Sequence, residues 1–213
     1  MIVNLTRRQL LASAAATTFA AALVTSVPAF AQSADVAKLM EPGPLGDMVL
    51  GNEDAPVTII EYASLTCGHC ANFHKNTLPE LKKQYIDTGK AKMIMREFPL
   101  DPVASGGFML ARCAPQDKYF DVLSAMFADQ RSWAFTQDPY NAMLNFSKQL
   151  GFTQESFEAC LGNQQLLDGI TAVQERASKE FGVNSTPTFF VNGERIVGAS
   201  SFDEFAKVIE KHL

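Results

Sequence analysis

Two of the four cysteines lie three residues apart, in the string Cys67-Gly68-His69-Cys70. Two thiols at this spacing can form a disulfide and exchange it with other thiols, because a thiolate attacks a disulfide through a mixed-disulfide intermediate. The apolar, β-branched run before them predicts a buried strand over 56–63, and the apolar residues after them recur at helical spacing. The cysteine pair is therefore expected where a strand leads into a helix.

This position predicts different roles for the two cysteines. A helix N-terminus carries partial positive charge, which stabilises a thiolate relative to a thiol. We therefore expect a low pKa for Cys67, with His69 adding a hydrogen-bond donor or a positive charge. Cys70 lies one turn into the helix, where burial should keep it protonated. The pattern predicts that Cys67 exchanges with the partner and that Cys70 resolves the mixed disulfide.

A pair of cysteines at this spacing can also be half of a structural zinc site. Such a site needs four ligands, and the remaining candidates are Cys113 and Cys160, which stand singly, and His74 and His212, which show no ligand spacing. We therefore expect no metal. A purely structural disulfide is the other alternative, and the expected position between a strand and a helix argues against it.

The rest of the chain indicates an α/β protein interrupted by helices. A second buried strand is expected over 92–100, which gives a strand, a helix kinked at Pro79 and a strand, the size of a βαβ unit. From Asp101 to about Phe181 the apolar spacing is helical almost throughout. This stretch predicts a helical module inserted into an α/β scaffold.

The C-terminal part returns to strands. Asn192-Gly193 separates two β-rich runs, and this pair supplies the two positive-φ residues that a two-residue hairpin turn needs. Ser201 and Glu204 then form a capping-box pattern ahead of an amphipathic helix. The sequence therefore predicts a hairpin followed by a final helix.

The N-terminal segment is typical of an export signal. Within residues 1–31, Arg7 and Arg8 precede an apolar run over Leu10–Val24, and a small-residue cleavage pattern follows at Ala29–Ala31. The two arginines resemble a twin-arginine signal, although a Sec signal can begin in the same way. A retained membrane anchor is the alternative. Export would bring the chain into an oxidising compartment, where cysteines pair or serve redox chemistry.

Composition and charge exclude several classes of protein. The chain has 213 residues, 47% hydrophobic and 19% charged, with a formal net charge of −5. This is an ordinary globular composition, which excludes intrinsic disorder. Nucleic acid is not expected as a partner, because binding phosphates requires clustered Lys and Arg.

The order of these motifs resembles a known family. The dithiol between strand and helix, followed by Thr186-Pro187 before the hairpin, resembles the thioredoxin fold. The helical insertion between the two halves resembles the DsbA family of periplasmic thiol oxidoreductases, over about residues 50–213. The fold implied is α/β, a thioredoxin-like fold with an inserted all-helical module. The expected organisation is a signal peptide over 1–31, a lead-in segment over 32–55, and a thioredoxin-like domain over 56–213 with its insertion at about 101–181.

The resemblance assigns roles to three more residues. Pro187 matches the family's cis-proline, and a cis bond there would turn the Thr186 backbone towards Cys67 and offer hydrogen bonds to a bound peptide. An ordinary trans proline opening a strand is the alternative. Glu61 matches a buried acid of the family that relays the proton of the resolving cysteine. The alternative is that the Glu61 side chain points to solvent at a strand end. Arg96 on the neighbouring strand is a possible partner for Glu61.

Cys113 and Cys160 lie in the helical module. Four cysteines allow three complete pairings, and the spacing favours Cys67 with Cys70 and these two together. Their disulfide would close a loop of about 47 residues, worth about 4 kcal/mol in the chain-entropy estimate. Two small buried hydrophobic side chains are the alternative. Some members of the family carry an extra disulfide in the insertion.

The resemblance implies an exported thiol:disulfide oxidoreductase without a cofactor. It would introduce disulfides into reduced exported proteins, be re-oxidised by a DsbB-type membrane oxidase, and act in the periplasm as a monomer. The alternative is an isomerase or reductase of misfolded proteins, kept reduced by a membrane reductant, because Gly68-His69 and Thr186 also occur in isomerase-like relatives. A redox-inactive copper-binding module is a second alternative, since two soft thiolates plus His69 suit Cu(I). Several large side chains could line a substrate surface, although core packing is the expected role of each: Phe73, Met109, Met126, Phe127 and Trp133.

Overall fold

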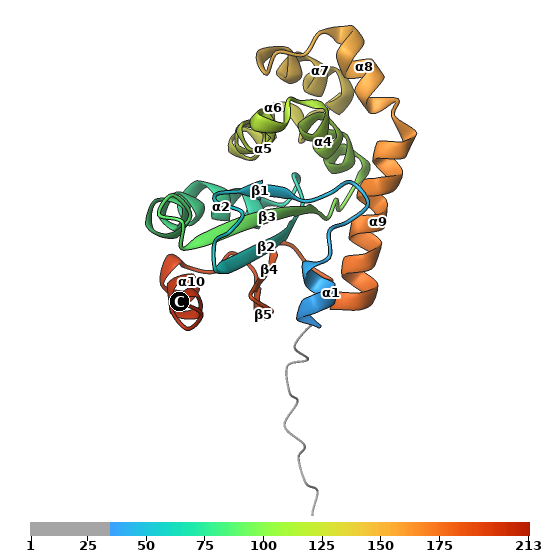
Figure 1. Cartoon of the computed structure of the whole chain (residues 1–213). Coiled ribbons are helices and arrows are strands. Elements are labelled where there is room, and N and C mark those ends of the chain that lie inside the picture. The colour runs from blue at the N-terminus through green and yellow to red at the C-terminus, as the bar shows by residue number, and fades with distance from the viewer. Residues whose placement is uncertain (1–34) are drawn as a thin grey trace, which may run out of the picture. The chain divides into compact units, whose positions relative to one another are not determined.

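The computed structural model describes residues 35–213. The predicted signal segment over 1–31 lies outside the described residues. Within them, one sheet of five strands forms the centre of the fold (Figure 1), in the order β1-β3-β2-β4-β5. The central strand β2 runs parallel to β3, and the other pairings are antiparallel. The strands are β1 (Met48–Leu50), β2 (Val57–Ala63), β3 (Ala91–Glu97), β4 (Thr188–Val191) and β5 (Glu194–Val197).

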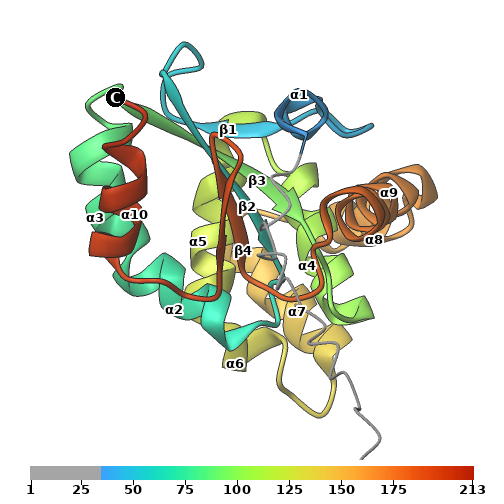
Figure 2. The same cartoon turned by 90° about the horizontal axis from the view of Figure 1, so that it is seen from below.

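Two sets of helices cover the two faces of this sheet. Side chains alternate between the faces along each strand, and every residue of β2 is buried, as its largely apolar, β-branched run predicts. Figure 2 shows α1 and α9 on one side of the sheet and α2, α3 and α10 on the other. The helices near the sheet are α1 (Val36–Met40), α2 (Gly68–Asn76), α3 (Leu78–Leu81), a π-helical turn (Lys82–Ile86), α9 (Gln164–Phe181) and α10 (Phe202–Ile209).

The elements between β3 and β4 are all helical in the described chain. In Figure 1, α4 to α8 lie above the sheet, and α9 runs down beside it towards α1. Helices α4, α7, α8 and α9 begin at side-chain caps, where an Asp, Thr or Asn oxygen accepts a backbone N–H that the helix leaves free. The fold class expected from the sequence is confirmed. The insertion consists of α4 (Pro102–Cys113), a 3₁₀ turn (Gln116–Lys118), α5 (Tyr119–Ala128), α6 (Gln130–Trp133), α7 (Pro139–Gln149), α8 (Gln154–Leu161) and α9.

The local sequence signals are reproduced in the structure. Asn192 and Gly193 take φ values of 45° and 93° at the β4–β5 turn, as the hairpin prediction requires. Ser201 and Glu204 form the predicted capping box of α10. The predicted kink at Pro79 takes the form of a break, because α2 ends at Asn76 and α3 begins two residues later.

The segment that the sequence marks only as a lead-in contains two elements. It holds α1 and the edge strand β1, which pairs antiparallel with β3. A three-residue strand is too short to show a period of two, and all three of its residues are half-buried. Arg96, Arg112 and Arg176 hold the segment in place by donating to backbone carbonyls between residues 38 and 46.

The large apolar side chains lie mainly in the core. Those considered for a possible substrate surface are at most 3% exposed, which confirms core packing as their role. They are Phe73, Met109, Met126, Phe127 and Trp133. Among the helices of residues 35–213, none has the length and apolar character needed to cross a bilayer.

Candidate active site

The two cysteines of the motif lie at the start of α2, at the end of the loop that follows β2. Cys67 is the N-cap residue, and its Sγ accepts the backbone N–H of Cys70 at 3.4 Å. Cys67 is 8% exposed and Cys70 is fully buried, while Gly68 and His69 between them are exposed. The structure describes the dithiol state, with both thiols free. An incoming sulfur atom can therefore reach Cys67 more readily than Cys70.

The surroundings of Cys67 favour its thiolate. A hydrogen bond from the Cys70 thiol is the largest cause that lowers the pKa of Cys67, from 9.0 to about 5. The backbone amides of His69 and Cys70 at the start of α2 lower the pKa further, against the opposing effect of burial. At neutral pH Cys67 is therefore a thiolate, the form that attacks disulfides.

Cys70 is shifted in the opposite direction. Burial is the largest cause that raises the pKa of its thiol, and the hydrogen bond to Cys67 and the negative charge of Glu61 add to it. Cys70 therefore stays protonated until a base removes its proton. The two thiols differ in reactivity although they are three residues apart.

The segment before β4 packs directly against Cys67. The peptide bond between Thr186 and Pro187 is cis, and Sγ of Cys67 lies 3.3 Å from the Thr186 carbonyl oxygen, to which Cys67 donates when it is protonated. The hydroxyl of Thr186 is buried and has no hydrogen-bond partner among the described residues. A substrate-binding role for Thr186 and Pro187 stays a prediction.

Glu61 lies in the middle of β2, on the face that α2 covers. It is fully buried, and its Oε2 lies 2.9 Å from Nε2 of His74. The His74 ring stacks on Phe127 of α5, with ring centroids 4.0 Å apart. Sequence reasoning missed His74, which was considered only as a metal ligand. Its place four residues after Cys70, on the same side of α2, was the available signal.

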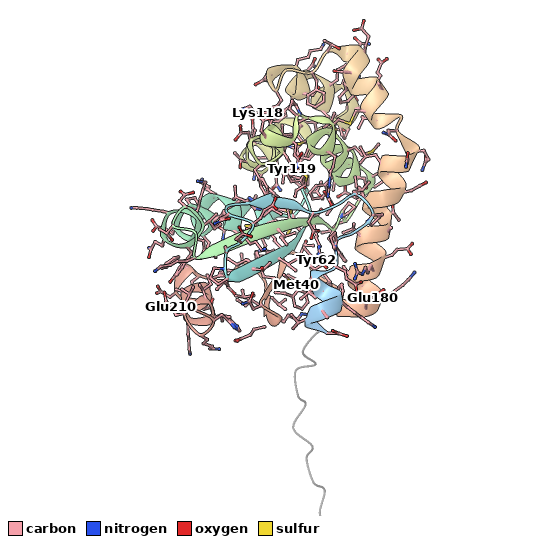
Figure 3. The ribbon with its side chains drawn as sticks, viewed as in Figure 1. Met40, Tyr62, Lys118, Tyr119, Glu180 and Glu210 are labelled. Carbon is pink, nitrogen blue, oxygen red and sulfur yellow. A yellow bond between two sulfur atoms is a disulfide. The ribbon has the colours of Figure 1, made fainter. Side chains whose placement is uncertain are left out.

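The suggested pairing of Glu61 with Arg96 is wrong. Arg96 is opposite Tyr62 in the β2–β3 register, so its side chain leaves the other face of the sheet. There it bonds to Asp47 at 2.9 Å and to the Tyr62 hydroxyl at 3.1 Å. Figure 3 labels Tyr62 on the side of the sheet that carries α1, and Tyr119 on the side of the insertion.

The helical insertion also contacts the active-site loop. The side-chain amide of Gln130, in α6, donates to the carbonyl oxygens of Leu65 at 2.8 Å and Cys67 at 3.1 Å. Gln130 is only 9% exposed. The sequence carried no signal for this residue, because the contact joins segments more than 60 positions apart. A hollow of about 330 Å³ lies between α2 and the α5–α6 region, and it is lined by Gly68 and Gln130 among others.

The other two cysteines form a disulfide. Cys113 at the end of α4 and Cys160 in α8 are bonded, with their Cα atoms 6.1 Å apart. This bond joins two helices of the insertion. Within residues 35–213, no group of three or more His, Cys, Asp or Glu side chains is placed to hold a metal ion.

Comparison with known proteins identifies the family of this chain. Residues 45–211 match the family model described as Thioredoxin. The fold and the dithiol at the start of α2 thus define a thioredoxin-fold protein with a Cys-x-x-Cys centre. The crystal structure of alpha-DsbA1 from Wolbachia pipientis is similar with a TM-score of 0.75 and 32% identity, over 82% of this chain and 94% of that chain. The chain belongs to the thioredoxin family and, within it, to the DsbA proteins.

Two further similar proteins show how far the likeness extends. A putative protein-disulfide oxidoreductase of Rickettsia conorii is 36% identical over 169 residues, which cover 78% of this chain. The chain spans about 60% of the length of that relative. BdbD from Bacillus subtilis, in its oxidised crystal structure, has a TM-score of 0.71 at 22% identity over 81% of this chain and 95% of that chain, and it shares the fold.

Proposed function

We propose that the protein is a thiol:disulfide oxidoreductase that introduces disulfides into reduced proteins through Cys67 and Cys70. The asymmetry of the two thiols is the observation that carries the proposal. Cys67 is reachable and has a pKa of about 5, whereas Cys70 is fully buried with a raised pKa. An attacking substrate would therefore select Cys67, and Cys67 is a good leaving group because its thiolate is stable.

The reaction follows from these positions. In the oxidised protein, a substrate thiolate attacks Sγ of Cys67, the Cys67–Cys70 bond breaks, and Cys70 leaves with the electron pair and takes up a proton. A second substrate thiolate then attacks the substrate sulfur of the mixed disulfide. This step forms the substrate disulfide and releases Cys67 as a thiolate. Two electrons pass from the substrate to the protein, and the dithiol itself is the redox centre, so no cofactor is needed.

Export and partners form part of the proposal. The signal-like segment over 1–31 supports action in the periplasm, on reduced or misfolded exported proteins. A DsbB-type membrane oxidase would then take electrons from the reduced dithiol. We propose that the protein acts as a monomer, with Thr186 and Pro187 aligning the bound substrate chain beside Cys67.

The test is oxidation of a reduced, denatured protein by stoichiometric amounts of the oxidised protein. Free substrate thiols should disappear, and the Cys67→Ser variant should give no reaction. Cys113→Ala/Cys160→Ala is the matched control, because it removes the other cysteine pair and should leave the transfer intact. A wild-type protein that transfers no disulfide would refute the proposal.

Two measurements separate the alternative functions. The state of Cys67 and Cys70 trapped in living cells would be oxidised for an oxidase and reduced for an isomerase or reductase. Tight Cu(I) binding without any disulfide transfer would instead indicate the copper-binding module.

A further inference from the structure

His74 and Glu61 form a buried polar pair beneath the resolving cysteine. Both side chains are nearly inaccessible, with 5% exposure for the histidine and none for the glutamate. Each keeps one buried polar atom without a hydrogen-bond partner in the described structure, Oε1 of Glu61 and Nδ1 of His74. Buried polar atoms are rarely left unpaired, because each costs about 1–3 kcal/mol. The unpaired oxygen of Glu61 therefore requires an explanation.

The single bond between the two residues fixes the carboxylate. Nε2 of His74 engages Oε2 of Glu61 at 2.9 Å, which leaves Oε1 as the oxygen free to accept a proton. Cys70 lies one turn before His74 on the same side of α2, so the carboxylate bonded to His74 lies under the part of α2 that carries the Cys70 thiol. Burial raises the pKa of that thiol, and the negative charge of Glu61 adds to the effect. The histidine ring is itself held between Phe127, which stacks on it, and Phe73, whose ring meets it edge-on at 5.5 Å.

We propose that His74 is a positioning residue for the step in which Cys70 closes the disulfide. Its Nε2–H holds Oε2 of Glu61, so that Oε1 accepts the proton of the Cys70 thiol. This inference adds a residue to the proposed reaction. It rests on the proposed function only because it requires Cys67 and Cys70 to exchange disulfides. Glu61 then carries the proton while the Cys70 thiolate attacks Sγ of Cys67 in a mixed disulfide. The bond from Cys67 to the partner sulfur breaks, and the partner leaves as a thiolate.

The ionisable side chains around Glu61 and His74 come from α2, β2 and α5. Cys70 faces the pair from α2, and Glu61 itself comes from β2. On α5, burial raises the pKa of the Tyr119 hydroxyl, and the negative charges of Glu97 and Glu61 add to this effect. The hydroxyl donates to Glu97 at 2.9 Å. Glu97 is in turn paired with Arg112. The pH dependence of the closing step should therefore report the Cys70 thiol, whose pKa is raised by burial and by the charge of Glu61.

Two substitutions separate positioning from packing. His74→Phe keeps a ring that can stack on Phe127 but removes the donor, whereas His74→Gln keeps an N–H donor at about the same reach but removes the ring. If His74 positions Glu61, the phenylalanine variant is impaired and the glutamine variant is rescued. If His74 only fills space, the order of the two variants is reversed.

The experiment mixes reduced protein with oxidised glutathione and quenches the reaction with acid at short times. Mass spectrometry then follows two rates: attack by Cys67, which adds one glutathione, and closure by Cys70, which releases it. We expect His74→Phe to slow closure at neutral pH by about tenfold or more, as loss of one hydrogen bond to a charged group implies, and to change its pH profile. His74→Gln should stay within about threefold of the wild type, and the attack rate should stay the same in both variants.

A double-mutant comparison ties the effect to the carboxylate. In a Glu61→Gln background, His74→Phe should slow closure no further, because the acceptor is already absent. Wild-type closure in His74→Phe, a slow His74→Gln, or an undiminished effect in Glu61→Gln would each overturn the proposal. The glutathione assay needs no protein substrate, so failure to oxidise reduced proteins would refute the proposed function and leave this result interpretable.

Discussion

The hydrogen bond from Cys70 makes a quantitative prediction for the pKa of Cys67. Hydrogen bonds to charged groups contribute about 1.5–3 kcal/mol, which corresponds to one to two pKa units. Cys70→Ala removes this donor and should raise the pKa of Cys67 from about 5 by one to two units. Cys70→Ser keeps an O–H donor at the same place and should leave the pKa low. The serine variant is therefore the matched control for the alanine variant.

The magnitude at working pH follows from the same values. A pH of 7 is about two units above the pKa of Cys67, so Cys67 is ionised. This ionisation stabilises the reduced protein by about 2.7 kcal/mol relative to a protein whose thiol has a pKa of 9.0. For a two-electron couple this makes the disulfide more oxidising by roughly 60 mV. Because the folded pKa is lowered, the stabilisation is complete above pH 9, is partial at pH 7, and disappears as the pH falls through 5.

The assay is the ultraviolet absorbance of the thiolate against pH, on the reduced protein with the Cys113–Cys160 disulfide intact. Redox equilibration with glutathione then gives the potential of the Cys67–Cys70 pair. A wild-type titration near the ordinary thiol value would refute the reasoning about the site. Equal pKa values in Cys70→Ala and the wild type would show that the Cys70 thiol is not the main cause.

Two further predictions concern the helical insertion. Cys113→Ala/Cys160→Ala opens a loop of 47 residues and should lower the free energy of unfolding by about 4 kcal/mol in denaturant titrations; an unchanged midpoint would contradict this. Gln130→Ala leaves the carbonyls of Leu65 and Cys67 without this donor and should cost about 1–3 kcal/mol by the same measurement. If Gln130→Ala is as stable as the wild type, these two bonds do not hold the loop.

Features governed by neighbouring residues were predictable from the sequence. The strand before Cys67 is a largely apolar, β-branched run, and the hairpin turn requires the positive φ values that Asn192 and Gly193 supply. The position of the dithiol at the start of a helix follows from these local patterns. The element order of the thioredoxin-like scaffold is therefore encoded in short stretches of the chain, each of which can be interpreted by itself.

Features governed by distant contacts were not predictable in the same way. Pairing Glu61 with Arg96 required the β2–β3 register, and a shift of one residue exchanges the two faces of the sheet. The hydrogen bond between His74 and Glu61 depends on how α2 is rotated relative to β2, and no local sequence pattern predicts this rotation. The edge strand β1 is stabilised by pairing with β3 rather than by its own sequence.

Apart from their effect on each other, the two thiols are influenced by different parts of the chain. Cys67 is influenced by the first turn of α2 and by the segment that ends at Thr186, both part of the thioredoxin-like scaffold. Cys70 is influenced by Glu61, whose partner His74 is covered by Phe127 from the insertion. Substitutions in the insertion that disturb this cover should therefore change the closing step more than the first attack. Because the Cys70 thiol also lowers the pKa of Cys67, the attack and the closing step remain coupled through the dithiol itself, and the surrounding segments act on that coupled pair from two sides.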